Sequence, residues 1–390
     1  MSRYTKTIVE ILNNSGVKIA IVNNLYPINE EGTVLTYSSE LSDYGTCRFR
    51  IATPDPMLTQ YGDITVPHQY QVRIVREGTV VWRGVIVDNP ERNQRYIEVV
   101  AHEYLWYLSK ILIRRDEELF DGDGKKHLKT FKSGTMKTVV TSLFNQAKAD
   151  LGNSPISGAS VGSVDTIQFP DSYSETGQWT FSDIFALQFD YHDALYVLKT
   201  FGIYSEADFE LDNDLVFRFK KQIGKQLFKV SFEYGQYGNM VDYNIPRFGK
   251  RMVNDLHSIA AITDDLGFAS ELLHINKTDE ASIKKYGKLE AATSFNDVKN
   301  KSTLKQRAIE ELRLISEPEA GPINLVLNEK GIPFGQYNVG DIVKVKIKDH
   351  NINFNDWRRI VGMTVSLHNT GREITVVQTN KPTKNMLEIE

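Results

Sequence analysis

The feature that most constrains this chain is a set of short runs in which apolar and polar residues alternate. Two of them, over 342–347 and 360–367, lie near the C-terminus. The segment 349–356 between them is rich in Asn and Asp and predicts a loop. A third run over 373–378 follows the turn Asn369-Thr370-Gly371. A period of two bounded by Gly and Asn turns predicts an antiparallel sheet with one buried face.

The first hundred residues show the same pattern. Residues 69–76 and 79–87 alternate on either side of Glu77-Gly78, which is the clearest hairpin signal in the chain. Further strands are expected at 17–23, 32–37, 47–52 and 95–101. Residues 1 to about 105 therefore predict a small barrel or sandwich, in which Trp82 is a buried strand aromatic.

Helical patterns separate the β-rich parts. Helices are expected over 104–113, over 136–150, from 192 or 193 to 201 with Gly202 as C-cap, and from 301 or 302 to 315. The Gly/Ser-rich stretch 151–164 predicts a loop, 207–219 a hairpin, and 228–234 and 254–261 strands. Residues 263–320 are polar and mainly helical in pattern. The fold class predicted is α+β, mainly β.

Length and composition limit the classes of protein to which this chain can belong. A chain of 390 residues allows two to four domains, and 41% hydrophobic with 25% charged residues is ordinary for a soluble protein. A net charge of −4 leaves no basic footprint for nucleic acid. The single Cys47 excludes a disulfide framework within the chain and indicates a reducing compartment. No signal segment and no membrane span is expected, since no run of 18 apolar residues occurs.

Motifs for catalysis or metal binding are weak. His102-Glu103 begins like the zinc motif HExxH, but Trp106 stands where the second His should be. Asp121-Gly-Asp-Gly begins like a calcium loop, but Lys125 takes a ligand position, so a solvated turn is the prediction. No phosphate loop, dinucleotide fingerprint or nucleophile elbow occurs. We therefore expect no catalytic residues, no cofactor and no metal.

Other titratable groups are expected to be structural. The eight histidines are dispersed, and none has a second His at ligand spacing on its own element, so each is expected to be a single core or surface residue. Asp264-Asp265 and Glu310-Glu311 are adjacent carboxylates that point in different directions on a helix, which favours solvated charges. The lysine cluster at 125–132 follows an acidic run and predicts a charge-balanced loop.

The order of these parts resembles the baseplate-hub and tail-tip proteins of tailed bacteriophages, including the N-terminal hub portion of siphophage tail-associated lysins. The resemblance rests on four passages and their order, over about 370 residues. They are VVWRGVIVDNPERNQRYIEVVAHEYLWYL at 80–108, DALYVLKTFGIYSEADFELDNDLVFRF at 193–219, SFEYGQYGNMVDYNIPRFGKRMVNDLHSIA at 231–260, and SIKKYGKLE at 282–290 with the helix and closing strands after it.

The resemblance implies two tube-like β-barrel domains with two helical or α/β inserts. The first barrel would span 1–105 and the second 231–262 joined to 321–380. The inserts would be 106–230 and 263–320, and 381–390 would form a tail. Three chains would place six barrels in a ring that continues the tail tube. Such a ring of like units is closed by heterologous contacts between neighbours. The loop 349–356 would then contact the tube or a neighbour.

The function implied is a structural, non-enzymatic hub in the virion tail tip, made in the host cytoplasm, that closes the tip and opens for DNA ejection. Its partners would be two further copies of itself, the distal tail protein ring, the tape-measure protein and tail fibre or receptor-binding proteins. DNA would pass the lumen unread, and an acidic chain suits that passage. No hydrolase motif precedes Glu390, so a hub without a lysin is expected. The alternatives are a cell-wall hydrolase with carboxylates in the inserts, and a carbohydrate-binding adsorption module whose exposed Tyr and Trp stack on sugars.

Overall fold

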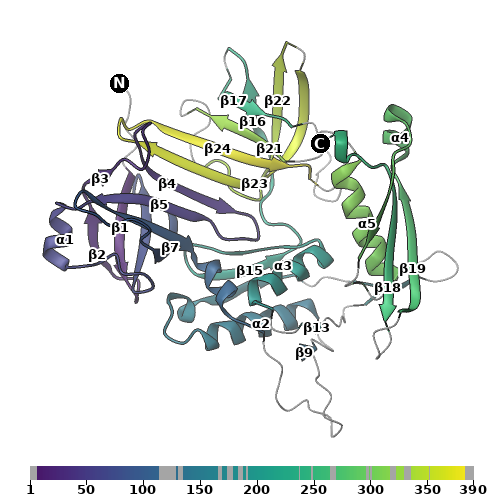
Figure 1. Cartoon of the computed structure of the whole chain (residues 1–390), viewed down its shortest axis with the longest axis horizontal. Coiled ribbons are helices and arrows are strands. Elements are labelled where there is room, and N and C mark those ends of the chain that lie inside the picture. The colour runs from purple at the N-terminus through teal and green to yellow at the C-terminus, as the bar shows by residue number, and fades with distance from the viewer. Residues whose placement is uncertain are drawn as a thin grey trace, which may run out of the picture.

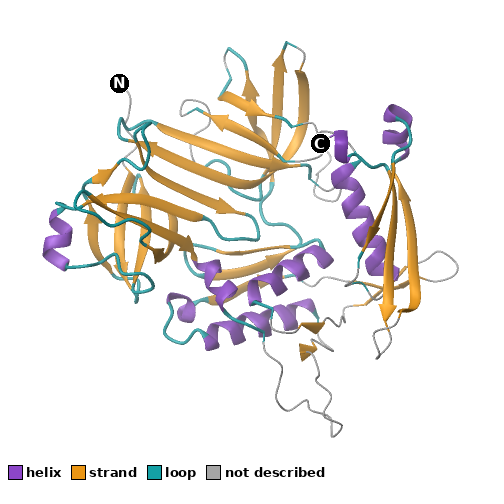
Figure 2. Ribbon diagram, in the orientation of Figure 1, coloured by secondary structure: helices purple, strands orange, loops and turns teal. Residues whose placement is uncertain are grey.

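One continuous sheet runs through most of the molecule, with helices below it and a smaller sheet beside it (Figures 1 and 2). The computed structural model describes residues 7–113, 129–130, 135–165, 169–173, 179–182, 188–189, 192–236, 238–246, 249–263, 269–295, 298, 301–316, 322–328, 335–350 and 352–382. None of the described helices is long and apolar enough to cross a membrane.

The first part of the sheet curls around its own core. Its strand order is β2-β1-β6-β7-β8-β5-β4, and the short β3 (Leu25–Tyr26) pairs with β5. The bounds are β1 (Thr7–Asn13), β2 (Lys18–Val22), β4 (Thr33–Glu40), β5 (Thr46–Ala52), β6 (Tyr70–Arg76), β7 (Thr79–Asp88) and β8 (Tyr96–Glu103), with α1 (Pro56–Tyr61) between β5 and β6. Inward residues from these strands form one cluster, so this N-terminal sheet wraps like a barrel whose edge at β2 stays open.

The expected hairpin and the expected buried tryptophan are both confirmed. β6 and β7 pair antiparallel across Glu77 and Gly78, which have φ of 49° and 85°, the left-handed geometry of a tight hairpin turn. Trp82 is fully buried, and its Nε1 donates a hydrogen bond of 2.9 Å to the carbonyl of Ser38 on β4, across the interior. β1 was not predicted, because residues 1–10 read as polar.

The C-terminal part closes into a barrel of six strands. This agrees with the predicted fold class, α+β and mainly β. The order β23-β22-β16-β17-β21-β24 returns to β23, and we name this ring the closed barrel. Its strands are β16 (Gln226–Tyr234), β17 (Met240–Asn244), β21 (Ile323–Leu327), β22 (Ile342–Asp349), β23 (Ile352–His368) and β24 (Glu373–Asn380). Gly340, with φ of 97°, turns the chain into β22, as its position before the alternating run predicts.

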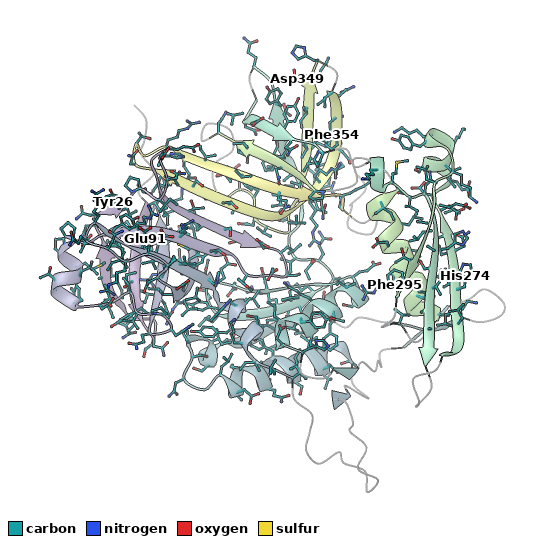
Figure 3. All side chains as sticks on the ribbon, in the orientation of Figure 1. Tyr26, Glu91, His274, Phe295, Asp349 and Phe354 are labelled. Atoms are coloured by element: carbon teal, nitrogen blue, oxygen red, sulfur yellow. The ribbon has the colours of Figure 1, made fainter. Side chains whose placement is uncertain are left out.

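The predicted loop over 349–356 is wrong. β22 and β23 stay paired up to Asp349 and Ile352, so only residues 350–351 separate the strands. The period of two continues through the polar stretch: Ile352 and Phe354 pack against the closed-barrel core, while the exposed Asn353 and Asn355 alternate with them. The polar residues of this stretch therefore form the solvent-facing side of a strand, not a loop. Figure 3 shows Asp349 and Phe354 near the tip of this hairpin.

A helical unit lies below the sheets (Figure 1). Its elements are η1 (Tyr104–Lys110), α2 (Met136–Asp150), η3 (Pro155–Gly158), β10 (Ser160–Val164), α3 (Ala194–Ser205), β14 (Asp208–Leu211) and β15 (Val216–Lys220). The predicted α2 and the β14–β15 hairpin are confirmed, whereas 151–164 contains η3 and β10 rather than only a loop. Two short pairs, β11 (Phe169–Tyr173) with β12 (Trp179–Ser182) and β9 (Lys129–Thr130) with β13 (Gln188–Phe189), complete it.

The predicted end of α3 at Gly202 is wrong, because the helix continues to Ser205 and is capped by Glu206 in the left-handed conformation. Gly202 serves close packing instead. A Cβ there would lie 2.8 Å from the carbonyl oxygen of Ala207, whose own N–H donates back to the carbonyl of Gly202. A glycine near a helix end therefore marked a tight approach rather than the end itself.

The remaining strands form an outer sheet, of order β19-β18-β20, that is separate from the closed barrel. Its elements are β18 (Asp255–Thr263), β19 (Ala269–Thr278) and β20 (Glu290–Ser294), with η4 (Gly249–Arg251), α4 (Glu280–Tyr286) and α5 (Lys301–Ile315). The strand expected at 254–261 exists as β18, but it pairs here and not with the barrel strands around it in sequence. The mainly helical pattern expected for 263–320 misses β19 and β20. α5 is confirmed, with Leu304, Ala308 and Leu312 buried.

Candidate functional site

The junction between the N-terminal sheet and the closed barrel is made by one strand. β23 pairs with β22 and β24 of the closed barrel, and also with β4 of the N-terminal sheet, where Val365 faces Tyr37. Val365 belongs to the core of the N-terminal sheet and Ile360 to the core of the closed barrel, while Met363 packs against both. The two parts are thus joined through backbone hydrogen bonds and through both cores.

Side chains reinforce the junction. Arg76 of β6 makes a salt bridge of 3.0 Å, Nη2 to Oε1, with Glu373 of β24, and both side chains are largely buried. Tyr37 and Tyr337 lie near this pair. Burial, with the Glu373 carboxylate second, raises the pKa of Tyr337 to about 12 and raises the pKa of Tyr37 further. The raised pKa values reflect burial, so the Arg76–Glu373 pair lies in a water-poor setting beside two phenols that stay protonated even in alkaline solution.

A cavity of about 730 Å³ opens beside this junction. It is lined by residues of the N-terminal sheet, the β14–β15 hairpin and the closed barrel, including Glu40, Arg76, Glu103, Asn213 and Asn338. Glu103 accepts hydrogen bonds from the Ser39 hydroxyl at 2.6 Å and from the Gly45 N–H at 2.7 Å. Burial raises the pKa of Glu103 to about 7, and the carboxylates of Glu40 and Asp43 add to the rise.

The closed barrel is anchored to the helical unit by a buried ion pair. The Arg359 guanidinium on β23 binds both carboxylate oxygens of Asp208 on β14, and it also donates to the carbonyls of Gly340 and Ile223. The second Asp208 oxygen accepts the N–H of Ile223. A charged pair with this many hydrogen bonds fixes the orientation of the hairpin against the barrel.

The outer sheet carries the one group in the described part of the chain whose side chains meet a metal-binding geometry. Asp255, His257 and Glu290 each offer a ligand atom, and these atoms lie within 4.8 Å of one another. His274 joins them, because its Nε2 lies 3.2 Å from Nδ1 of His257. The expectation that every histidine is a single residue is therefore wrong for this pair. Two different strands bring the rings together, which spacing along one element could not reveal.

The structure places the other sequence motifs as follows. His102 and Glu103 lie on β8, a strand, so they point to opposite sides of the sheet and do not lie on the helix that the zinc motif requires. Glu310 and Glu311 lie on α5. The Asp121 loop, Asp264-Asp265 and most of the lysine cluster at 125–132 lie outside the described residues; Lys129 belongs to the short strand β9.

Comparison with known proteins finds no matching family model and no matching curated sequence. Solved structures do match, over nearly the whole chain. The 43 kDa tail protein of prophage MuSo2 from Shewanella oneidensis aligns with a TM-score of 0.62 at 12% identity, covering 96% of this chain and 98% of that one. The tail protein from Neisseria meningitidis MC58 aligns with a TM-score of 0.59 at 11% identity, covering 97% of both chains.

Prophage tail protein gp18 from Listeria monocytogenes EGD-e aligns with a TM-score of 0.56 at 11% identity, covering 97% of this chain and 96% of that one. At such identities the likeness concerns the fold, and it extends from end to end of each protein. The sequence resemblance to phage tail proteins and the structural comparison agree. This chain has the fold of phage tail proteins.

Proposed function

We propose that this chain is a structural hub protein of a phage tail tip. The observation that carries the proposal is the end-to-end match to three phage tail proteins, with at least 96% of each chain covered. A wrapped N-terminal sheet and a closed barrel joined by β23 supply two tube-like units per chain. The proposed first barrel is 1–105. The second, expected at 231–262 joined to 321–380, is built from β16, β17, β21, β22, β23 and β24 and leaves out β18.

Three chains of this kind assemble, in this proposal, into a ring of six barrel units that continues the tail tube. Within one chain the two units are joined by the pairing of β4 with β23. Between neighbouring chains, one unit contacts the next through the same heterologous interface, repeated around the ring. The ring contacts the distal tail protein ring and the tape-measure protein on one side and fibre or receptor-binding proteins on the other. It closes the tip until DNA leaves through the lumen, and it has no catalytic role.

The test is the assembly state. Size-exclusion chromatography with light scattering should give a mass three times that of the 44.4 kDa chain, and negative-stain images should show a threefold particle with a central hole. The same measurements should be repeated after co-expression with a distal tail protein, the proposed neighbour of the ring, which would offer a template for assembly. A monomer in both conditions would contradict the proposed ring.

The alternative of a cell-wall hydrolase has one observation in its favour, although the carboxylate concerned, Glu103, lies on β8 and not in the inserts at 106–230 and 263–320. Glu103 lines a cavity, and its pKa of about 7 is that of a general acid at neutral pH. Both of its oxygens are engaged by Ser39 and Gly45, which favours a structural role. Release of soluble fragments from purified peptidoglycan, abolished by Glu103→Gln, would support hydrolysis; no release by the wild-type chain supports the hub.

A further inference from the structure

One face of the outer sheet gathers polar side chains from three strands. Asp255 and His257 alternate along β18 and so point to the same face. The register places Glu290 of β20 beside Asp255, and His274 of β19 beside Ile259 on that face. The opposite face supplies Ala260 and Leu273 to the core under α5. The polar face is thus the one turned away from α5; Figure 3 labels His274 on this sheet.

The Asp255 carboxylate has one oxygen without a partner. Only 1% of the residue is exposed, and its Oδ1 makes no hydrogen bond within the described residues. Nε2 of His257 lies 3.7 Å from this oxygen, which is too far for a hydrogen bond, and Lys288 pairs with the other oxygen, Oδ2. A buried carboxylate oxygen without a partner is costly, so this oxygen is suited to a ligand that supplies positive charge.

The two histidines orient that ligand position. Nδ1 of His257 lies 3.2 Å from Nε2 of His274, so one nitrogen donates and the other accepts. When His257 donates from Nδ1, its Nε2 carries a lone pair that faces Asp255 Oδ1. Metal-binding histidines commonly donate their second ring N–H to an acceptor in this way, which fixes the tautomer and the ring. His274 is thus a positioning residue rather than a ligand.

We propose that Asp255, His257 and Glu290 bind a divalent transition-metal ion, for which Zn²⁺ is the probe. Zinc ligands lie about 2.0–2.2 Å from the metal and hence roughly 3.4 Å from one another. The ligand atoms, within 4.8 Å of one another, approach this spacing, and rotation of the exposed Glu290 side chain closes the remainder. Imidazole with carboxylates selects such ions over Ca²⁺ and Mg²⁺, which take all-oxygen sets.

Lys288 is the internal competitor of the ion. Its ammonium lies 2.7 Å from Oδ2 of Asp255 and also contacts Glu290, so its single positive charge is shared by two of the three ligands. Its side chain is 55% exposed and can leave for solvent without losing a packed position. Metal binding then exchanges one cation for another, and the bound ion ties the short edge strand β20 to β18.

Because Lys288 and the metal ion compete for the same carboxylates, removing a ligand and removing Lys288 should change the metal affinity in opposite directions. Calorimetric titration of the tag-free chain with Zn²⁺ should show one site, and His257→Gln and Glu290→Gln should each weaken it by about tenfold or more. Lys288→Gln should tighten binding by about two- to fivefold, the worth of one exposed ion pair. The matched control is His350→Gln, since the exposed His350 also lies beside an aspartate, Asp349, but outside the three-ligand group. It should bind Zn²⁺ as the wild type does.

Co²⁺ gives an independent readout, because a site with His257 as ligand produces visible absorption bands that His257→Gln removes. Both replaced ligand side chains are partly or fully exposed, so circular dichroism should show retained folds. Absence of one-site Zn²⁺ binding, equal affinity in wild type and His257→Gln, or weaker binding by Lys288→Gln would overturn the proposal. Equal affinity for Mg²⁺ and Zn²⁺ would also overturn the proposal, because it would show that the His257 imidazole does not contribute to binding.

Discussion

At the scale of single residues, Glu103 is the group whose charge the fold changes most plainly. Its pKa rises from an ordinary 4.5 to about 7 in the folded chain, because burial penalises the carboxylate. Between these two values the unfolded chain has released the proton while the folded chain holds it. The native state binds more protons, so its stability falls as pH rises across this window. Above about pH 7 the loss is complete.

Glu103→Gln is therefore expected to reduce the fall in unfolding free energy between pH 4.5 and 7. A glutamine can accept the Gly45 N–H through its carbonyl and donate to the Ser39 hydroxyl, so both contacts survive. We expect the variant to be more stable than wild type at pH 8 by on the order of 1–3 kcal/mol, and no more stable at pH 4. Urea denaturation at several pH values measures this.

Glu30→Gln serves as the control, since Glu30 lies exposed in a turn of the same N-terminal sheet. It should keep the wild-type pH profile. If Glu103→Gln had the same slope as wild type between pH 4.5 and 7, the carboxyl would not hold its proton in the native state. The raised pKa and the hydrolase alternative that depends on it would then both fall.

The sequence could predict Trp82 and the Glu77-Gly78 turn, because both depend on residues close together in the chain. It could not predict the Asp255 cluster. Asp255 and Glu290 are joined by a parallel pairing of β18 with β20, and no strand was predicted at 290–294. A retrospective signal does exist: two alternating strands each carry a histidine on the polar side, at His257 and His274.

At the scale of elements, the pair Arg359–Asp208 decides how the β14–β15 hairpin sits on β23. Arg359→Met should destabilise the chain by about 3–5 kcal/mol, because it strands the Asp208 carboxylate in a buried setting. Asp208→Leu added to it should recover part of this loss, although the Ile223 N–H then lacks its acceptor. Urea denaturation of both single variants and the double variant gives the coupling energy.

The exposed pair Arg92–Asp63 is the matched control for this cycle, with 54% and 36% of the side chains exposed. Arg92→Met should cost at most about 1 kcal/mol. A similar cost for Arg359→Met would mean that water reaches the Asp208 carboxylate and that the pair does not anchor the hairpin.

Elements also show where local patterns stop being informative. The alternation that predicted β22 and the second half of β23 also continued through 352–356, but its Asn and Asp residues suggested a loop. Since polar residues at every second position face solvent on a strand, alternation was the better guide there than composition. β18 had a correct pattern and an unexpected partner, because the choice of sheet depends on contacts far apart in sequence.

At the scale of the whole molecule, β23 makes the N-terminal sheet and the closed barrel one mechanical unit. Its 17 residues contribute Ile360 to one core and Val365 to the other. The outer sheet, by contrast, shares no hydrogen-bonded strand with either among the described residues, and α5 covers it with a core of its own. The proposed hub needs the N-terminal sheet and the closed barrel held in a fixed arrangement, and the shared strand β23 provides this. The outer sheet has no such requirement.

Hydrogen exchange should therefore show the N-terminal sheet and the closed barrel opening together and the outer sheet opening separately. Val365→Ala, at a site 1% exposed in the N-terminal core, should lower the protection of both units by the same amount, on the order of 2 kcal/mol. Leu304→Ala, at a fully buried site on α5, should lower the protection of α5, β18 and β19 and leave the other two units unchanged. Loss confined to the N-terminal sheet in Val365→Ala would mean that this sheet and the closed barrel unfold independently. The shared strand would then join them without coupling them, and rigidity in a ring would have to come from contacts between chains.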